Sequence, residues 1–250
     1  MKISIVLTYF NRRSQFLHTL ESIRYYGDPE IIVVDDASTE RIDDIKGINL
    51  IRIEPEQKWW TNPCVPYNMG FAKASGDIII IQNPECIHVG DILKYASKLK
   101  PGHVFSFGAY SLDYHLSYDS YDPFALKQLI INEPQRCQVA HHGWYNHSVY
   151  RPEALHFCNA ITRKDLKRLG GFDERYANGT GHDDNDMVMR IRRAGIDLRI
   201  IDDPFVIHQK HNRTNYSNPD IIAGCLLNTR LFQRASLEKT IKSPENKYFK

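Results

Sequence analysis

The sequence predicts an α/β fold with a mainly parallel sheet flanked by helices. Three short runs of β-branched and apolar residues, at 3–7, 31–34 and 78–81, have the composition of strands buried on both faces. Between these runs lie segments whose apolar residues recur at helical spacing, and the connections are short. Strands that alternate with helices in this way form a parallel sheet with helices on both faces.

The other elements of the first hundred residues follow from the same patterns. Apolar residues repeat at helical spacing from Ser14, a candidate N-cap, to Ile23, and Gly27-Asp28-Pro29 ends this helix. The sequence also predicts a strand at 48–53, a loop containing Trp59 and Trp60 at 55–66, and helices at 68–75 and 91–99.

The second half is less regular. Strands are expected at 104–107, 155–162, 198–201 and 205–208, and helices at 123–130, 163–169, 183–194 and 219–234. No internal repeat, low-complexity segment or linker divides the chain. We therefore expect a single domain over residues 1–250.

Composition excludes several classes of protein. The 250 residues are 42% hydrophobic and 25% charged, which suits a compact core. The net charge of +2 creates no overall field for nucleic acid, and no run approaches the roughly 18 apolar residues of a membrane span. The start of the chain lacks the apolar core of a signal peptide, and the five scattered cysteines fit reduced thiols. These features predict a cytoplasmic protein with no nucleic-acid partner.

Polar and acidic residues follow two of the predicted strands. Gln82-Asn83-Pro84-Glu85 follows the strand at 78–81, and Asp35-Asp36 ends the strand at 31–34. Ligands bind beyond the carboxyl ends of strands in open α/β sheets. A carboxylate there can hold a metal and a phosphate, or accept a hydrogen bond from a nucleobase N–H or a ribose hydroxyl. Each segment alone is also explained by a polar turn or a helix cap.

Two further groups carry candidate chemistry. Asp183-Asp184-Asn185-Asp186 opens a predicted helix, and three carboxylates exceed what capping requires, although acidic residues do favour a helix N-terminus. His208 and His211 offer imidazole ligands for a transition metal, but a lone histidine is more often structural. The His141-His142 and Cys86/His88 pairs lack the spacing of a complete metal site.

Taken together, these residues resemble the motifs of glycosyltransferase family 2, whose members have a GT-A fold. The resemblance extends from residue 3 to about residue 211. It is carried by 4–12 (SIVLTYFNR, first strand and donor loop), 32–38 (IVVDDAS, base motif), 68–77 (the helix before the Asp-x-Asp strand), and 170–174 (GGFDE) with 181–186 (GHDDND), the acceptor and catalytic-base motifs.

One departure from the family pattern concerns the metal. The family usually has Asp-x-Asp after the strand, whereas this chain has Asn83 and Glu85 at those places. The second place keeps a carboxylate, which is the one that usually contacts metal. Asn83 can still bind a ribose hydroxyl, but the lost charge lowers the expected metal affinity and leaves open that metal is dispensable.

The resemblance implies an inverting transfer of a sugar from a nucleoside diphosphate donor, in which a base deprotonates an acceptor hydroxyl. It divides the chain into a donor half at about 1–100, an acceptor and catalytic half at about 101–217, and a C-terminal helix with a basic tail at 218–250. The base is expected to be Asp184, and the metal, Mn²⁺ or Mg²⁺, is expected on Glu85 and His208, with His211 as the fallback. The implied donor-binding residues are Thr8, Tyr9, Asn11, Arg12, Asp36, Asn68, Lys73, Asn83 and Glu85.

The resemblance also implies partners. Asp36 can accept the ring N–H of uracil, so a UDP-sugar is the expected donor, although guanine offers the same group. The acceptor, a glycan, lipid-linked sugar or protein, is expected against Trp144, Tyr145, Asp173 and Asp183, with a hydrogen bond from His142. The loop at 210–217 is expected to order over the donor.

The C-terminal tail has two interpretations, and two other functions remain as alternatives. Residues 226–250 carry six Lys and Arg against two Asp and Glu, a net charge of +4, which suits an anionic membrane or simply a solvated tail. A nucleotidyltransferase would carry a Gly-rich loop after the first strand, but residues 8–13 contain no glycine. A non-catalytic nucleotide- or sugar-binding protein is supported only by the altered residues 83–85.

Overall fold

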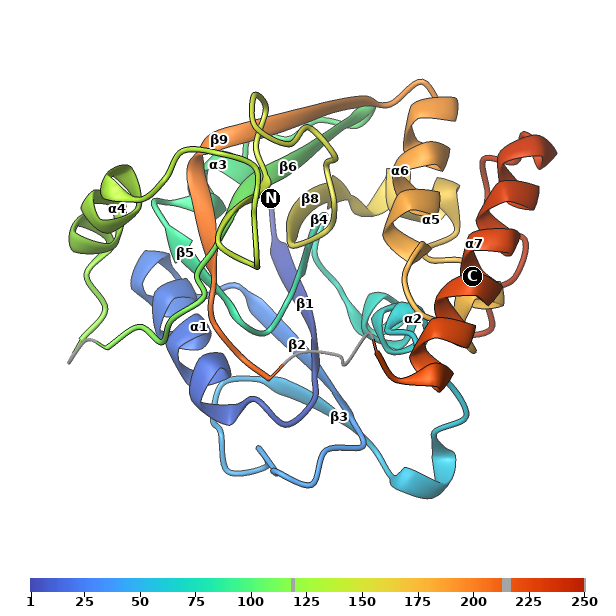
Figure 1. The fold of residues 1–250 in the computed structure, drawn as a ribbon, viewed down its shortest axis with the longest axis horizontal. Helices are drawn as coiled ribbons and strands as arrows, with labels where there is room; N and C mark the ends of the chain where they lie inside the picture. Colours follow the sequence, from blue (N-terminus) through green and yellow to red (C-terminus); the bar gives the residue numbers. More distant parts are fainter. Residues whose placement is uncertain (118–119, 213–216, 250) are drawn as a thin grey trace.

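The computed structural model describes residues 1–117, 120–212 and 217–249, which form a nine-stranded sheet flanked by helices (Figure 1). The strands run in the order β3-β2-β1-β4-β8-β6-β9-β5, and β7 pairs with β6. Their bounds are β1 Ile3–Tyr9, β2 Glu30–Asp36, β3 Asn49–Ile53, β4 Ile78–Gln82, β5 Cys86–Val89, β6 His103–Ser111, β7 Gly143–Asn146, β8 Cys158–Thr162 and β9 Asp197–His208. The helices are α1 Arg13–Tyr26, α2 Cys64–Lys73, α3 Ile92–Ala96, α4 Pro123–Asn132, α5 Arg163–Leu169, α6 Asp183–Arg193 and α7 Pro219–Glu238, with short 3₁₀ turns at Pro55–Gln57 and Glu174–Tyr176.

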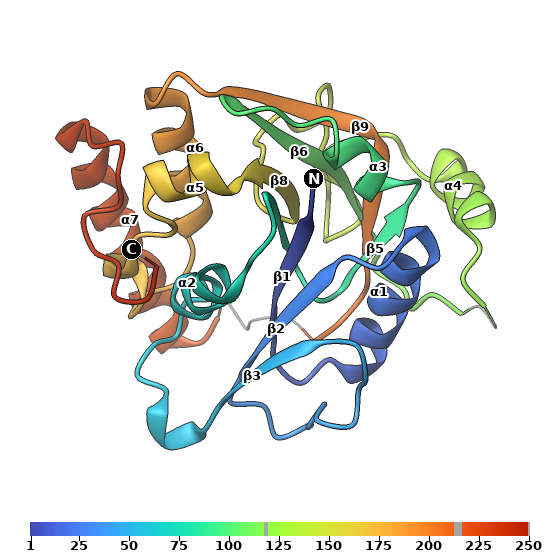
Figure 2. The ribbon, with the colours of Figure 1, turned by 180° about the vertical axis from the view of Figure 1, so that it is seen from behind.

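Helices bury both faces of the sheet, and successive side chains of a strand point to opposite faces. In β1, Ile5 and Leu7 join one core with α1 and α3, whereas Val6 joins the other with α2, α5 and α6. Figures 1 and 2 show α1 on one side of the sheet and α2, α5 and α6 on the other, with α7 outermost beside α6. The α/β prediction is therefore confirmed.

The parallel strands bring their carboxyl ends to one edge. β3, β2, β1 and β4 are parallel neighbours, so Tyr9, Asp36 and Gln82 end together at that edge. β8 then pairs antiparallel with β4 and β6, and β5 pairs antiparallel with β9, which makes the sheet mixed. The last residue of β9, His208, pairs with Cys86, so the start of β5 meets the end of β9.

Several elements differ from the sequence prediction. The strands expected at 198–201 and 205–208 are one strand, β9, whose pairing with β6 shifts register between Phe107 and Gly108. α2 begins at Cys64, inside the expected loop. Pro66 is compatible with this start, since it lies in the first turn, where backbone N–H groups have no helical acceptor. The four-residue strands β5 and β7 were not predicted, since such short segments give little periodic signal.

The C-terminal tail is not simply solvated, which corrects that alternative. Ser243 and Phe249 are buried, and the N–H of Ser243 donates to the carbonyl of Leu169 at 2.8 Å. The side chain of Asn246 donates to the carbonyl of Gly170 at 2.7 Å. The tail therefore packs on the segment that follows α5. Among the helices in the described part of the chain, none is long and apolar enough to cross a membrane.

Candidate active site

A cavity of about 560 Å³ lies beyond the carboxyl ends of the parallel strands. It brings together predicted site residues from both halves of the chain. Its lining consists of Thr8, Tyr9, Phe10, Arg12, Asp36, Lys58, Trp60, Thr61, Asn62, Pro63, Tyr67, Asn83, Pro84, Glu85, His156, Gly181 and Asp183. A second cavity of about 460 Å³ shares Phe10 and Arg12 with the first and is also lined by Asn11 and His211. The predicted donor loop thus borders both cavities.

Asp36 ends β2 at the wall of the larger cavity. Its Oδ1 accepts a hydrogen bond from Trp60 Nε1 at 2.8 Å, and its Oδ2 accepts one from Lys58 Nζ at 2.8 Å. Both donors come from the loop after β3. They fix the carboxylate, and each carboxylate oxygen can accept more than one hydrogen bond. Asp36 is therefore held in one orientation and can still accept a ligand N–H.

Asn83 and Glu85 lie in the turn between β4 and β5. The hydroxyl of Tyr67, from α2, donates to Asn83 Oδ1 at 3.1 Å. This contact orients the amide at the cavity wall. The side chain of Glu85 is only 3% exposed and is surrounded by three basic groups.

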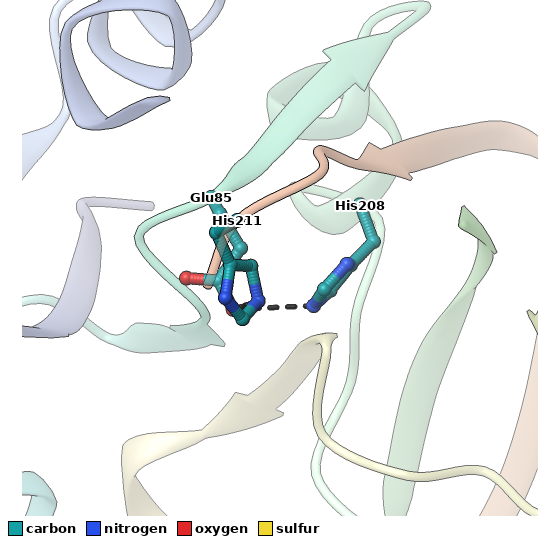
Figure 3. A group of neighbouring side chains, drawn as sticks. All are labelled: Glu85, His208 and His211. Carbon is teal, nitrogen blue, oxygen red and sulfur yellow. Dashed lines mark ion pairs between the residues drawn. The ribbon is translucent and has the colours of Figure 1, made fainter. Parts of the chain in front are cut away.

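Glu85, His208 and His211 form the candidate metal cluster (Figure 3). Glu85 Oε1 lies 3.2 Å from His208 Nε2 and 3.6 Å from His211 Nε2, and the three candidate ligand atoms lie within 4.8 Å of one another. Figure 3 shows the two imidazole rings turned toward the carboxylate. On the other side, Arg12 donates to Glu85 Oε2 at 2.9 Å.

The electrostatics follow from this geometry. Although burial opposes it, Arg12 and then His208 hold the pKa of Glu85 well below its usual range, so the group is a carboxylate. Burial lowers the pKa of His211 to about 4, against the attraction of Glu85. The His211 ring is therefore neutral at pH 7. Its Nδ1 lies 2.6 Å from the carbonyl of Asn212, which fits an Nδ1–H donor and a free lone pair on Nε2.

These residues fit a divalent cation. A carboxylate and two imidazoles form a mixed oxygen and nitrogen donor set, which suits Mn²⁺ better than Ca²⁺. A backbone carbonyl that orients the far nitrogen of a ligand histidine is typical of metal sites, and His211 has one. His208, the expected second ligand, and His211, the expected fallback, both belong to this candidate donor set.

The acidic start of α6 approaches the same cavity. Asp183 is 4% exposed and lines it, and its Oδ1 accepts from Asn62 Nδ2 at 3.0 Å. Asp184 has a side chain that is 21% exposed, and its Oδ2 lies 3.8 Å from His156 Nδ1. His156 itself lines the cavity. Asp184 is therefore placed next to the lining rather than within it.

Asp186, the third carboxylate, has a structural role. It forms an ion pair with Arg190 at 2.6 Å, and the fully buried guanidinium also donates to the carbonyls of Leu169 and Gly171. This network ties α6 to the end of α5. The excess of carboxylates over capping needs is thus partly explained by bracing.

Two predicted donor residues lie elsewhere. Asn68 is fully buried; its Nδ2 donates to the carbonyl of Phe172 and to Glu174 Oε1, and its Oδ1 accepts from the N–H of Phe172. It braces α2 against the 170–174 segment. Lys73 is an exposed residue in the last turn of α2 and does not line the cavity. The donor roles expected for Asn68 and Lys73 are corrected accordingly.

The predicted acceptor residues are mostly enclosed. Trp144 is 4% exposed and packs on Tyr110 and Phe205, so it offers no open face for stacking. Asp173 is fully buried and paired with Arg175 at 2.8 Å. Core packing and ion pairing therefore replace the contacts expected of these two residues.

Two other predicted acceptor residues, Tyr145 and His142, also contact neighbouring side chains. Tyr145 is 7% exposed, with its ring centroid 5.2 Å from that of His208. His142 lies between Asp113 and Glu133, at 3.0 and 2.9 Å. Of the lid loop expected at 210–217, residues 213–216 lie outside the described residues.

Five residues that line the cavity were not predicted from the sequence: Lys58, Trp60, Asn62, Tyr67 and His156. The available signal was the polar and aromatic composition of residues 58–62, Lys-Trp-Trp-Thr-Asn, between a strand and a helix. No pattern in the sequence distinguished His156, which precedes β8, from other histidines.

Comparison with known families decides the classification. The sequence profile described as glycosyl transferase family 2 matches residues 4–151, which is more than half of the chain. The chain belongs to glycosyl transferase family 2. A second profile, described as the N-terminal domain of galactosyltransferase, matches residues 157–212 of this glycosyltransferase and spans its acidic helix and His208. No curated protein matches the sequence.

Solved structures agree with this fold. S. aureus TarS 1–349 in complex with UDP-GlcNAc has a TM-score of 0.64 at 16% identity, over 96% of this glycosyltransferase and 69% of that chain. The mannosyltransferase PcManGT from Pyrobaculum calidifontis, in complex with GDP-Man and Mn²⁺, has a TM-score of 0.54 at 17% identity. The match covers 86% of this glycosyltransferase and 59% of that chain. At such identities the likeness shows the fold, and the predicted GT-A fold is confirmed.

Proposed function

We propose that this glycosyltransferase moves a sugar from a UDP-sugar to an acceptor hydroxyl with inversion at the anomeric carbon, assisted by Mn²⁺ or Mg²⁺. The observation that carries the proposal is that Asp36, Glu85 and Asp183 line one cavity. The carboxylates that we propose for the base, the metal and a hydroxyl therefore face one cavity, and Asp184 adjoins Asp183.

Asp36 supports a nucleobase with a ring N–H. Trp60 and Lys58 fix its carboxylate at the cavity wall, where an N–H of uracil can donate to it. Adenine has no ring N–H of this kind, whereas guanine does. The structural relatives bind UDP-GlcNAc and GDP-Man, which fits a nucleoside diphosphate donor. UDP is the donor class that we propose.

Glu85, His208 and His211 would hold the cation, which offsets charge on the diphosphate leaving group when it is bound. Arg12 and Thr8 line the same cavity and would bind the phosphates and ribose, together with Asn83. The buried, largely water-free position of Glu85 strengthens these interactions.

Asp184 is proposed as the general base, with Asp183 binding a hydroxyl of the sugar or the acceptor. Asp184 takes the proton of the acceptor hydroxyl as the acceptor oxygen bonds to the anomeric carbon. The bond between that carbon and the diphosphate oxygen breaks, and its electron pair leaves with the diphosphate. His156, whose Nδ1 lies 3.8 Å from Asp184 Oδ2, can receive the proton afterwards.

We also propose an acceptor class, a location and a role for the C-terminal tail. A glycan, lipid-linked sugar or protein hydroxyl fits the chemistry, and action in the cytoplasm, with peripheral contact at a membrane face, fits the sequence. Lys239, Lys242 and Lys247 supply basic residues after α7. Co-sedimentation with anionic liposomes at low salt supports the membrane contact, and its absence overturns it.

A thermal-shift screen tests the donor class directly. The protein is heated with UDP, GDP or ADP, each with and without Mn²⁺, and hydrolysis of UDP-sugars is assayed in parallel. We expect UDP with Mn²⁺ to stabilise most and a UDP-sugar to be turned over. Equal stabilisation by ADP contradicts the role of Asp36, and binding without turnover favours a non-catalytic binding protein.

A further inference from the structure

Arg12 occupies a special position at the candidate metal cluster. Its guanidinium donates to Glu85 Oε2 at 2.9 Å, while His208 and His211 face the other oxygen, Oε1. The Glu85 side chain is 3% exposed, whereas that of Arg12 is 29% exposed. Arg12 thus connects the buried carboxylate to open space, and it lines both neighbouring cavities.

The pairing has a clear electrostatic reason. A buried carboxylate requires a counter-charge. Arginine remains protonated at every physiological pH, and the Arg12 guanidinium lies 2.9 Å from Glu85 Oε2. In the protein alone, Arg12 is therefore a permanent cation that balances Glu85.

A divalent cation on Glu85 changes this balance. The cation would share the Glu85 carboxylate with the Arg12 guanidinium. Two positive groups on one carboxylate repel each other strongly in a site with little water. The diphosphate of a donor offers Arg12 a stronger partner, because guanidinium groups pair well with phosphates. The backbone of Arg12 is fixed, since its carbonyl accepts from the N–H of Phe16 at 2.9 Å, so only the side chain need turn.

We propose that Arg12 is an exchangeable counter-ion, which pairs with Glu85 in the free protein and moves to the diphosphate when a cation takes the carboxylate. This inference rests on the proposed donor and metal site. It makes cation and nucleotide binding mutually dependent: the cation alone must compete with Arg12, and the nucleotide removes that competition. Arg12 is thus a positioning residue that sets the order in which the site fills.

Mn²⁺ binding measured without turnover tests the exchange. Free Mn²⁺ is followed by electron paramagnetic resonance in titrations of wild type and Arg12→Gln, with and without UDP. We expect Arg12→Gln to bind Mn²⁺ alone about tenfold more tightly than wild type, because the competitor is gone. UDP should then raise Mn²⁺ affinity several-fold less in the variant than in wild type.

Matched variants separate exchange from other effects. Arg13→Gln removes the same charge from the next residue, whose side chain is also 29% exposed but is paired with Asp44. It should behave as wild type, and Arg12→Lys, which keeps the charge, should retain most of the coupling. Arg12→Met is a second charge-free variant, and circular dichroism melts establish that each protein is folded.

The outcomes distinguish this inference from the proposed function. Unchanged or weaker Mn²⁺ binding by folded Arg12→Gln and Arg12→Met overturns the exchange, even if the wild type transfers sugar. Tighter Mn²⁺ binding by both variants supports the exchange, even if no UDP-sugar is turned over and the proposed function fails. Equal tightening by Arg13→Gln attributes the effect to general charge and also overturns the exchange.

Discussion

The carboxylate of Asp183 accepts a hydrogen bond from Asn62 Nδ2 at 3.0 Å, and its other oxygen, Oδ2, has no hydrogen-bond partner among the described residues. The side chain is buried at the wall of the cavity. Burial, and then the neighbouring Asp184 carboxylate, raise the pKa of Asp183 above its ordinary value. A group held in an unfavourable state at a cavity is typical of a functional site.

This arrangement gives stability a defined pH dependence. Between the unfolded and the raised folded pKa of Asp183, the folded state binds more protons, so the free energy of unfolding falls as pH rises. Asn does not ionise. Asp183→Asn should therefore be more stable than wild type at pH 7, and the difference should vanish as pH falls below 3.8. Urea denaturation from pH 3 to pH 8 measures it.

Asp28→Asn, an exposed substitution in the turn after α1, is the matched control and should change stability little at any pH. A folded Asp183→Asn that is less stable than wild type at pH 7 would show that the carboxylate stabilises the fold. The functional interpretation of its burial would then be wrong.

Metal binding should depend on both Glu85 and His208. With UDP present, Glu85→Gln and His208→Ala should each weaken Mn²⁺ binding at least about tenfold, since each removes one ligand. Isothermal titration with Mn²⁺ measures the change. His103→Ala, at the surface, is the control. Wild-type affinity in both ligand variants would exclude the cluster as the metal site.

The base-binding role of Asp36 predicts a selective loss. Asp36→Asn keeps the shape of the side chain but removes the charge that Lys58 and Trp60 hold in place. Losing a charge-assisted hydrogen bond should weaken UDP binding about tenfold or more. ADP binding should be unaffected, and equilibrium titrations of both nucleotides check this. Equal weakening of UDP and ADP binding would show that Asp36 does not act through recognition of the base.

Asn68 should matter for stability rather than for the donor. Asn68→Ala leaves the N–H of Phe172 and its partners unsatisfied in the core, which costs about 1–3 kcal/mol of unfolding free energy. Urea denaturation measures this loss, and UDP affinity of the folded variant should equal that of wild type. Weaker UDP binding at unchanged stability would restore the donor role expected from the sequence.

The strand ends could be predicted from the sequence, and with them much of the site. Apolar runs located β1, β2 and β4, and parallel strands bring their carboxyl ends to one edge, so Thr8, Asp36 and Glu85 meet. The order of the motifs along the sequence also predicted that Asp183, from the second half of the chain, belongs to the site.

The rest depends on packing between distant segments. Trp144 has the composition of a stacking residue, but contacts with Tyr110 and Phe205 bury it. The tail is basic, yet Asn246 binds the carbonyl of Gly170. Neither contact has a local signal, and the same holds for His156 beside Asp184. Side-chain pairs that are far apart in sequence require the fold to be known first.

The most direct test of the account is transfer by Asp184→Asn, measured with UDP affinity on the same folded sample. Loss of a general base should lower kcat by about 10²–10⁴, with the Kd for UDP unchanged. If Asp184 serves only as the acidic start of α6, the variant should lose about 1 kcal/mol of stability and keep its kcat. A nearly intact kcat in the folded variant would contradict the assignment of Asp184 as the base.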